Sequence, residues 1–315
     1  MQWGTALEQR IDQVADRMLR DAAAHGVRSA LIEFMVFVLK QAWACAFGAI
    51  LLVVIIAARL FYPDDAALAR NDALTLAAVL IQVAMLAFGL ETVRELRVIV
   101  LFHITGTIME LFKTDVGSWA YAAEGMLRIG GVPLFSGFMY AAVGSYMVRV
   151  YRLFDLRFSR YPRRWMTALV AAAIYANFFT HHFWWDARWV LFLAVVVLWG
   201  RTVMHARIRL QVLRLPLLAV FAGVAFFIWL AENIGTWAGA WAYPDQLDGW
   251  QPVSISKLGS WFLLMIISVV LVTWVYPPRR PDAATLALHS LPSAADIRAA
   301  REENSSANGE RRREQ

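Results

Sequence analysis

The chain has 315 residues, of which 60% are hydrophobic and 17% are charged, with a net charge of +6 at pH 7 and a mean hydropathy of +0.52. Because soluble globular proteins are usually about half apolar and about a quarter charged, this composition excludes an ordinary soluble domain. The single cysteine, Cys45, excludes an intramolecular disulfide and a cysteine metal site.

The first 30 residues are charged and lack the apolar core of a cleavable signal peptide. Apolar side chains at Leu7, Ile11, Val14 and Met18 recur at helical spacing, with charged residues between them. This pattern predicts an amphipathic cytoplasmic helix within residues 1–30. The helix either lies on the inner membrane surface or packs on the cytoplasmic loops.

Eight apolar runs follow, each with about the length that an α-helix needs to cross a bilayer. They cover residues 35–61, 72–90, 98–112, 130–149, 166–182, 189–205, 215–234 and 256–276. No β-barrel alternation is visible, so we predict an all-α, polytopic membrane helix bundle with about eight transmembrane helices over residues 35–276. The composition of residues 277–315 turns to Pro, Ser, Glu and Arg, which predicts a disordered cytoplasmic tail.

Arginines set the predicted orientation. With eight spans, the basic loops and both termini fall on one side, which the positive-inside rule makes cytoplasmic. The largest basic cluster consists of Arg149, Arg152, Arg157, Arg160, Arg163 and Arg164. The same rule explains why Lys40, Arg201 and His205 occur at the cytoplasmic ends of their apolar runs. Since insertion topology already accounts for the positive charge, nucleic acid is not a predicted partner.

Two segments share the pattern E-x3-T-x2-G-x-W-A-Y, and each begins at the end of an apolar run. They are Glu110–Tyr121 and Glu232–Tyr243. The segments follow the third and seventh runs, and this offset of four predicts two parallel halves related by an axis along the membrane normal. Carboxyl groups at membrane depth are costly, which makes Glu110 and Glu232 the first candidates for function.

The third apolar run carries a polar stripe. His103, Thr107 and Glu110 are spaced i, i+4 and i+7, so they share one helix face. A histidine and a carboxylate on one stripe could relay a proton or bind a cation. The alternative is that they only hold neighbouring helices together through hydrogen bonds.

Further polar residues are predicted at the depth of the two glutamates. Asn177 and His181 share a face at the end of the fifth run, next to His182; Asn233 follows Glu232, and Lys257 opens the eighth run. Two histidines and two carboxylates could bind a divalent metal, but adjacent histidines point about 100° apart on a helix, so no metal site is predicted. No cofactor is identified.

Four groups are expected to meet in one pocket in the outer half of the membrane: Glu110, Glu232, His181 and Lys257. Lys257 is either the counter-ion of one glutamate or a side chain that reaches the outer headgroups. Four aromatic residues of the repeated segments are predicted as interfacial anchors, with a ligand cage as the alternative: Trp119, Tyr121, Trp241 and Tyr243.

Several segments resemble the bacterial membrane proteins grouped as domain of unknown function 817. The resemblance covers roughly residues 35–276 and is carried by Lys40–Cys45, Leu101–Glu110, Gly130–Tyr140, Asn177–His182, Trp229–Gly235 and Ser256–Phe262. It implies a multi-pass protein of the bacterial inner (cytoplasmic) membrane and implies no activity. A weaker resemblance, carried by the acid, the aromatic turn and Val132-Pro133-Leu134, is to carotenoid hydratases and related membrane cyclases.

Three functions are compatible with these features. The first is an intramembrane enzyme acting on a lipid or isoprenoid, with Glu110 or Glu232 as general acid and His103 or His181 as its proton partner. The second is a transporter of a small solute or ion, with its site between two parallel halves. The third is a scaffold without chemistry. Membrane lipid is the expected partner in all three, and the substrate is a lipid or another small molecule.

Overall fold

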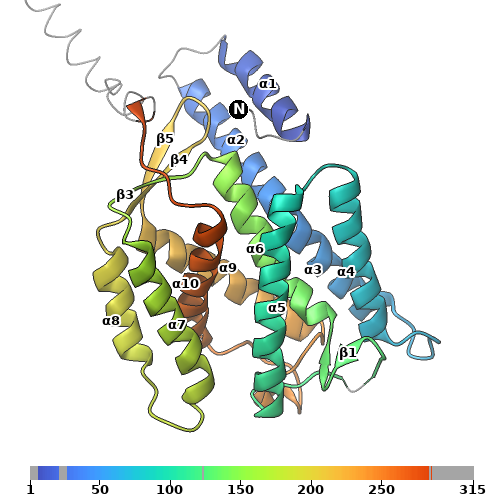
Figure 1. The fold of residues 1–315 in the computed structure, drawn as a ribbon. Coiled ribbons are helices and arrows are strands. Elements are labelled where there is room, and N and C mark those ends of the chain that lie inside the picture. Colours follow the sequence, from blue (N-terminus) through green and yellow to red (C-terminus); the bar gives the residue numbers. More distant parts are fainter. Residues whose placement is uncertain (1–5, 21–26, 123, 284, 286–315) are drawn as a thin grey trace, which may run out of the picture.

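The computed structural model describes residues 6–20, 27–122, 124–283 and 285, which form a helix bundle with short strands at its two ends (Figure 1). The helices are α1 (Ala6–Arg20), α2 (Val27–Ala44), α3 (Ala46–Phe61), α4 (Arg70–Ala87), α5 (Val93–Asp115), α6 (Phe135–Leu153), α7 (Arg164–Thr180), α8 (Arg188–Trp199), α9 (Leu217–Trp237) and α10 (Lys257–Val275), with a 3-10 turn η1 (Pro244–Gln246). The strands are β1 (Arg128–Ile129), β2 (Val132–Pro133), β3 (Arg157–Ser159), β4 (Val203–Arg207) and β5 (Val212–Pro216). We refer to the end of the bundle with α1 and β3–β5 as the α1 end, and to the end with β1 and β2 as the β1 end.

Every predicted apolar run contains a helix, but fewer helices qualify as membrane spans than predicted. Within the described residues, α4, α9 and α10 are long and apolar enough to cross a membrane, and the α2–α3 pair, bent by 61°, makes a fourth if it counts as one span. Helix α8 has 12 residues and extends about 18 Å, against about 30 Å of hydrocarbon. The chain is therefore a largely helical protein with apolar helices compatible with membrane insertion.

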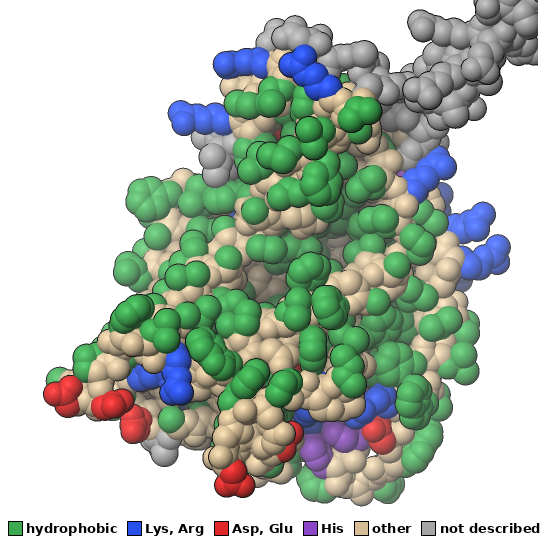
Figure 2. Space-filling view, turned by 180° about the vertical axis from the view of Figure 1, so that it is seen from behind, with side chains coloured by type: hydrophobic (Ala, Val, Ile, Leu, Met, Phe, Trp, Pro, Cys, Tyr) green, Lys and Arg blue, Asp and Glu red, His purple; other side chains and the backbone are tan. Residues whose placement is uncertain are grey.

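An apolar belt covers the outside of the bundle. Figure 2 shows hydrophobic side chains across the middle of one face, whereas most of the Asp, Glu and His side chains visible there lie at the β1 end. Large exposed hydrophobic residues occur on α3, α4, α7, α8 and α9, among them Val53, Leu80, Leu169, Val197 and Phe227. Such a belt is far more extensive than the apolar patches of soluble monomers, and it supports insertion into lipid.

The strands correct the all-α prediction. The last three residues of the sixth predicted apolar run, 203–205, belong to β4, the central strand of the antiparallel sheet β3-β4-β5. Met204, His205 and Ala206 are all buried, and Arg207 is exposed. The strand therefore lacks the strict alternation that marks a half-buried strand in a sequence, and it directly follows an apolar helix.

Helices α5 and α6 approach closely because glycines line their contact. A Cβ atom at Gly106 would lie 2.3 Å from Cγ of Tyr140, and one at Gly137 would lie 2.5 Å from Cε1 of His103. Only a residue without a side chain fits at such distances. The Tyr140 ring of α6 therefore lies directly against α5, the helix that carries Glu110.

Two basic side chains that the sequence assigned to the basic side of the membrane are buried at the α1 end. Arg149 lies inside α6 with a side chain 1% exposed, and its guanidinium contacts the Glu91 carboxylate at 2.8 Å. Gln82 and Ser145 also donate to Glu91. Lys40 is buried too, and its Nζ donates to the carbonyl of Ile208 at 2.7 Å. Arg149 was counted in the basic cluster and Lys40 was explained by the basic side of the membrane, but in the structure both side chains are buried and bind partners inside the protein.

Helix α1 packs on the rest of the α1 end. The buried carboxylate of Glu8 pairs with Arg152, and Asp12 pairs with Lys40 at 3.1 Å. At the other terminus, residues 277–283 and 285 of the predicted tail are described, and the N–H of Phe158 donates to the carbonyl of Arg279. The remainder of the predicted tail lies outside the described residues.

Candidate functional site

Glu110 lies at the β1 end of α5, 3% exposed, with both carboxyl oxygens hydrogen-bonded. Oε2 accepts from Trp119 Nε1 at 2.6 Å and from the Tyr121 hydroxyl at 2.7 Å, and Oε1 accepts from the Tyr140 hydroxyl at 2.7 Å. Gly117, with a φ of 72°, ends the helix and turns the chain back toward it. Trp119 and Tyr121 are two residues apart in the extended segment that follows, so both reach the same carboxyl group.

Glu232 repeats this arrangement on α9. The Tyr243 hydroxyl donates to Oε1, and Trp261 Nε1 donates to Oε2. Gly239, with a φ of 65°, makes the corresponding turn. The two segments differ in the tryptophan that donates to the glutamate. Trp241 packs against Gly235, where a Cβ atom would lie 2.4 Å from the Trp241 ring. Trp261 of α10 therefore donates to Glu232 in the position that Trp119 has at Glu110.

The two segments contact each other directly. Ala120 and Ala242 exchange two backbone hydrogen bonds, at 2.9 and 3.0 Å, in an isolated antiparallel bridge. Beside the bridge, the Trp119 and Tyr243 rings meet edge to face, with centroids 6.1 Å apart. Trp119 donates to Glu110 and Tyr243 donates to Glu232, so one chain of contacts joins the two carboxyl groups.

The donors restrict where a proton can sit on each glutamate. An indole N–H only donates, so the oxygen that it contacts must offer a lone pair. Trp119 and Trp261 both contact an Oε2 atom. Each Oε1 atom faces only a tyrosine hydroxyl, which can donate or accept. The neutral acid therefore carries its proton best on Oε1, toward Tyr140 in one copy and toward Tyr243 in the other.

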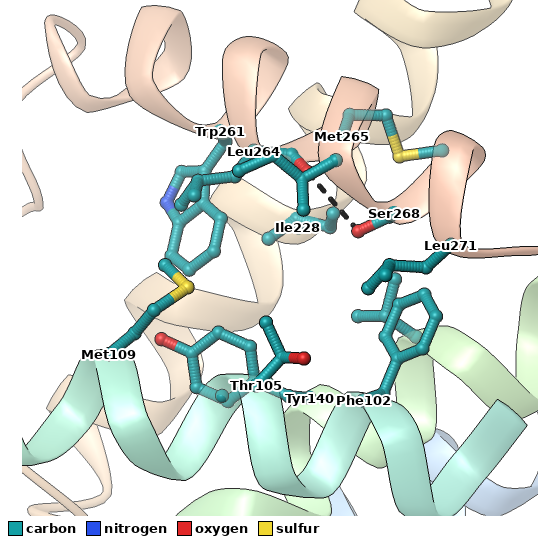
Figure 3. Close-up of a pocket in the computed structure, with 13 residues that line it drawn as sticks. Phe102, Thr105, Met109, Tyr140, Ile228, Trp261, Leu264, Met265, Ser268 and Leu271 are labelled. Atoms are coloured by element: carbon teal, nitrogen blue, oxygen red, sulfur yellow. Dashed lines mark hydrogen bonds between the residues drawn. The ribbon is translucent and has the colours of Figure 1, made fainter. Parts of the chain in front are cut away.

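An apolar crevice between α5 and α10 borders this cluster. It encloses about 40 Å³, and its lining includes Tyr140 and Trp261, the donors to Glu110 and Glu232. Figure 3 shows Phe102, Thr105 and Met109 of α5 facing the side chains of α10 across the crevice. A volume of this size holds only a few waters, so a larger molecule can enter only if α5 and α10 separate.

A second cavity lies at the β1 end. Its volume is about 400 Å³, and its wall includes Tyr121. Tyr121 and Tyr140 donate to different oxygens of Glu110. The three side chains therefore form a continuous hydrogen-bonded path from this cavity to the crevice.

The predicted histidines contact groups other than the glutamates. His103 packs edge to face on Phe138, with ring centroids 4.7 Å apart, and its Nδ1 is buried without a hydrogen-bond partner. The His181 ring is tilted by 39° against the His182 ring, with centroids 4.1 Å apart, and its Nδ1 contacts the carbonyl of Asn177. Between described residues, no hydrogen bond joins either histidine to Glu110 or Glu232. In that part of the chain, no group of three or more His, Cys, Asp or Glu side chains could hold a metal ion.

His182 contacts α5 through a lysine. Its Nε2 lies 2.6 Å from Lys113 Nζ. Because an ammonium group only donates, Nε2 must accept, so this ring is neutral with its proton on Nδ1. The contact ties the turn after α7 to α5, next to the Glu110 segment.

The supporting residues mainly shape loops. Asn177 donates to Asp186 at 3.2 Å and accepts from the N–H of Ala187. Although burial of Asp186 raises its pKa, this hydrogen bond and one from the N–H of Arg188 hold the pKa below its ordinary value. Asn233 accepts from the N–H of Val253 at 2.9 Å and so fixes the loop before α10.

Lys257 lies next to the Glu232 half of the cluster. Its Nζ is 4.3 Å from the centroid of the Tyr243 ring. Within the described residues it forms no ion pair with Glu232 or Glu110 at 4 Å or less. The structure thus brings Lys257 to the glutamate cluster through a cation–π contact.

Tyr140 and Trp261 are the site residues that sequence reasoning missed. They lie 30 residues after Glu110 and 29 residues after Glu232, respectively. Extending the comparison of the two segments into the next apolar run would have pointed to both, because each occupies almost the same place in its copy.

Three comparisons with known proteins bear on this arrangement. A family described as "Protein of unknown function (DUF817)" matches residues 33–269. The chain belongs to this family. Uncharacterized protein YoaT of Bacillus subtilis (strain 168) is 42% identical over 247 residues, which cover 77% of this chain and 91% of that protein. The DUF817 match includes both glutamates, Tyr140 and Trp261.

The comparison with solved structures gives a distant similarity. A chain from the crystal structure of a cross-linked MvINS trimer is 14% identical, with a TM-score of 0.43, and the match covers 61% of this chain and 98% of that chain. None of these matches is a carotenoid hydratase or cyclase, so that weaker resemblance gains no support.

Proposed function

We propose that this DUF817 protein is an intramembrane acid–base enzyme that transfers a proton to or from a lipid or isoprenoid in the crevice. The observation that carries the proposal is the hydrogen-bonded path from Tyr121 through Glu110 to Tyr140. Tyr140 lines the crevice and is the group that touches the substrate. Glu110 supplies the proton to Tyr140, and the cavity at the β1 end restores it through Tyr121.

The same proposal includes an internal repeat in which α5–α6 and α9–α10 are equivalent. The ends of α5 and α9 support it, because Ser118 N bonds to Lys113 O and Ala240 N bonds to Gly235 O at equivalent positions. Two hydrogen bonds exchanged between Ala120 and Ala242 are what a two-fold axis between the copies would produce. Glu232 then acts as the second acid, with Tyr243 as its hydroxyl partner.

The surroundings support an enzyme more than a transporter. A transport site must open toward both ends of the bundle. Toward the α1 end, the interior is filled by the ion pair of Glu91 and Arg149 and by the side chains that bind it. A lipid enzyme needs only a lateral opening between α5 and α10, where the crevice already lies.

Glutamine replacements test the proposed chemistry. Glu110→Gln and Glu232→Gln place an amide oxygen toward the indole and an amide NH₂ toward the tyrosine, so the hydrogen bonds are kept and only the titratable proton is lost. We expect Glu110→Gln to lower substrate turnover by about 10²- to 10⁴-fold. The lipids of a deletion strain, its complemented strain and each variant strain, compared by mass spectrometry, give the readout.

Two outcomes decide between chemistry and a purely structural role. Under the proposal, both variants accumulate and melt like the wild type but leave the lipid profile of the deletion strain unchanged. If the double variant restores the wild-type profile at native expression, the carboxyl groups only hold helices together and the enzyme proposal fails.

The proposed topology has eight membrane passages, both termini in the cytoplasm and the β1 end outside. In a Cys45→Ser background, we expect Asp248→Cys to react with an impermeant maleimide in spheroplasts, because Asp248 is exposed in the loop before α10. Arg163→Cys, exposed at the α1 end, should react only after permeabilisation. Reversed labelling of the two positions contradicts this orientation.

A further inference from the structure

The cavity at the β1 end has a wall that suits an amphiphilic ligand. Its volume of about 400 Å³ is bounded by the indoles of Trp237, Trp241 and Trp250 and by the Tyr121 ring. Trp237 and Trp250 are 42% and 45% exposed, so the rim of the cavity is open. Indole rings at such a rim are typical of the membrane–water interface, where lipid headgroups lie.

One arginine lines the cavity and a second lies against its wall, and no carboxylate is among the lining residues. Arg59 of α3 lines the cavity and is exposed. Arg70 of α4 donates to the carbonyls of Ala238 and Gly239, and its Nε is buried without a hydrogen-bond partner. In the described part of the chain, neither arginine forms an ion pair, although Asp64 and Asp65 lie in the loop between them.

We infer that this cavity binds the phosphate headgroup of an anionic lipid. Such a lipid is then the substrate of the proposed enzyme, so the inference rests on the proposed function. Guanidinium groups bind phosphate oxygens through charge-assisted hydrogen bonds, and two like charges side by side are neutralised best by an anion. Arg70 lies against the wall of the cavity, because its NH1 donates at 3.1 Å to the carbonyl of Gly239, which lines the cavity. The exposed indoles of the rim favour a lipid over a free ion.

The position of the cavity connects the headgroup to the chemistry. Tyr121 is both part of the wall and the first member of the path to Glu110 and Tyr140. A lipid whose phosphate is held by Arg59 therefore lies beside the groups that would move the proton. Headgroup binding and proton transfer use different residues, so they can be tested separately.

Native mass spectrometry of the purified full chain in detergent tests the inference. The probes are dihexanoyl phosphatidylglycerol, dihexanoylglycerol with the same chains but no phosphate, and inorganic phosphate. We expect the phosphatidylglycerol probe to bind, and Arg59→Gln to weaken its binding about tenfold or more. Arg97→Gln is the matched control, because Arg97 is an exposed helical arginine near the α1 end of α5.

Each other outcome overturns the inference. Equal binding of dihexanoylglycerol shows that the phosphate is not recognised, and unchanged binding by Arg59→Gln shows that the cavity is not the site. Inorganic phosphate that binds as tightly as the lipid makes this a site for the free ion.

Glu110→Gln should bind phosphatidylglycerol like the wild type. If that variant also restores the lipid profile, the proposed chemistry fails while the lipid site stands.

Discussion

Replacing Arg149 by methionine is expected to destabilise the protein by about 3–5 kcal/mol, the usual cost of removing one partner from a buried ion pair. The Glu91 carboxylate would keep the hydrogen bonds from Gln82 and Ser145 but lose its counter-ion. Both side chains of the pair are 1% exposed, so water cannot replace the guanidinium. Equilibrium unfolding of the purified protein in mixed micelles measures the change.

The double variant separates the ion pair from simple packing. Glu91→Gln combined with Arg149→Met removes both charges, so we expect it to recover most of the stability lost by Arg149→Met alone. Arg97→Met, at an exposed position of α5, should change the free energy of unfolding by less than about 0.5 kcal/mol. A double variant that is as unstable as the sum of the single changes would show that the two side chains do not depend on each other.

The parts of the site that the sequence predicts come from its repeated segments. Glu110 and Glu232, with the aromatic residues of the same segments, are joined by the bridge between Ala120 and Ala242. The repetition was informative because a glycine follows both helices. In each segment, the turn at this glycine returns the backbone toward the glutamate of the same segment. Because the repeated pattern contains the glutamate, the turn and an aromatic donor to the glutamate, a dozen residues are enough to predict their contact.

The histidine partners could not be predicted from helical spacing. His103 and Glu110 are seven residues apart on α5, and this spacing gives a common face but puts about 10 Å between them along the axis. The oxygens of Glu110 bind donors from the following loop and from α6. Helical periodicity describes one helix, whereas the partners of a buried carboxyl group come from whichever elements pack on it.

Buried charges were the other limit of sequence reasoning. Arg149 and Lys40 stand near the ends of apolar runs, where basic residues usually reach lipid headgroups. In the structure Arg149 binds Glu91 from the turn before α5, and Lys40 binds a carbonyl that follows β4. These partners are distant in sequence, by 58 residues for Arg149 and 168 for Lys40. No local pattern distinguishes a paired charge from a charge in the interface.

Tyr140→Phe is expected to abolish function to nearly the extent of Glu110→Gln. The phenyl ring keeps the close contact with Gly106, so α5 and α6 should pack as before. What is lost is the hydroxyl between Glu110 Oε1 and the crevice, and without it the acid has no path to a substrate there. We expect turnover to fall by about 10²- to 10⁴-fold, with little change in melting temperature.

Tyr146→Phe is the matched control for this loss, because Tyr146 lies on the same helix and its hydroxyl makes only a long contact, 3.4 Å, with Gln41. The lipid profile of a complemented deletion strain should be restored by Tyr146→Phe but not by Tyr140→Phe. The converse result, or restoration by both variants, would place the substrate away from the crevice. Glu110 would then act through Tyr121 on the cavity at the β1 end, where Arg59 and the indoles would bind the whole substrate and α5 and α10 need not separate.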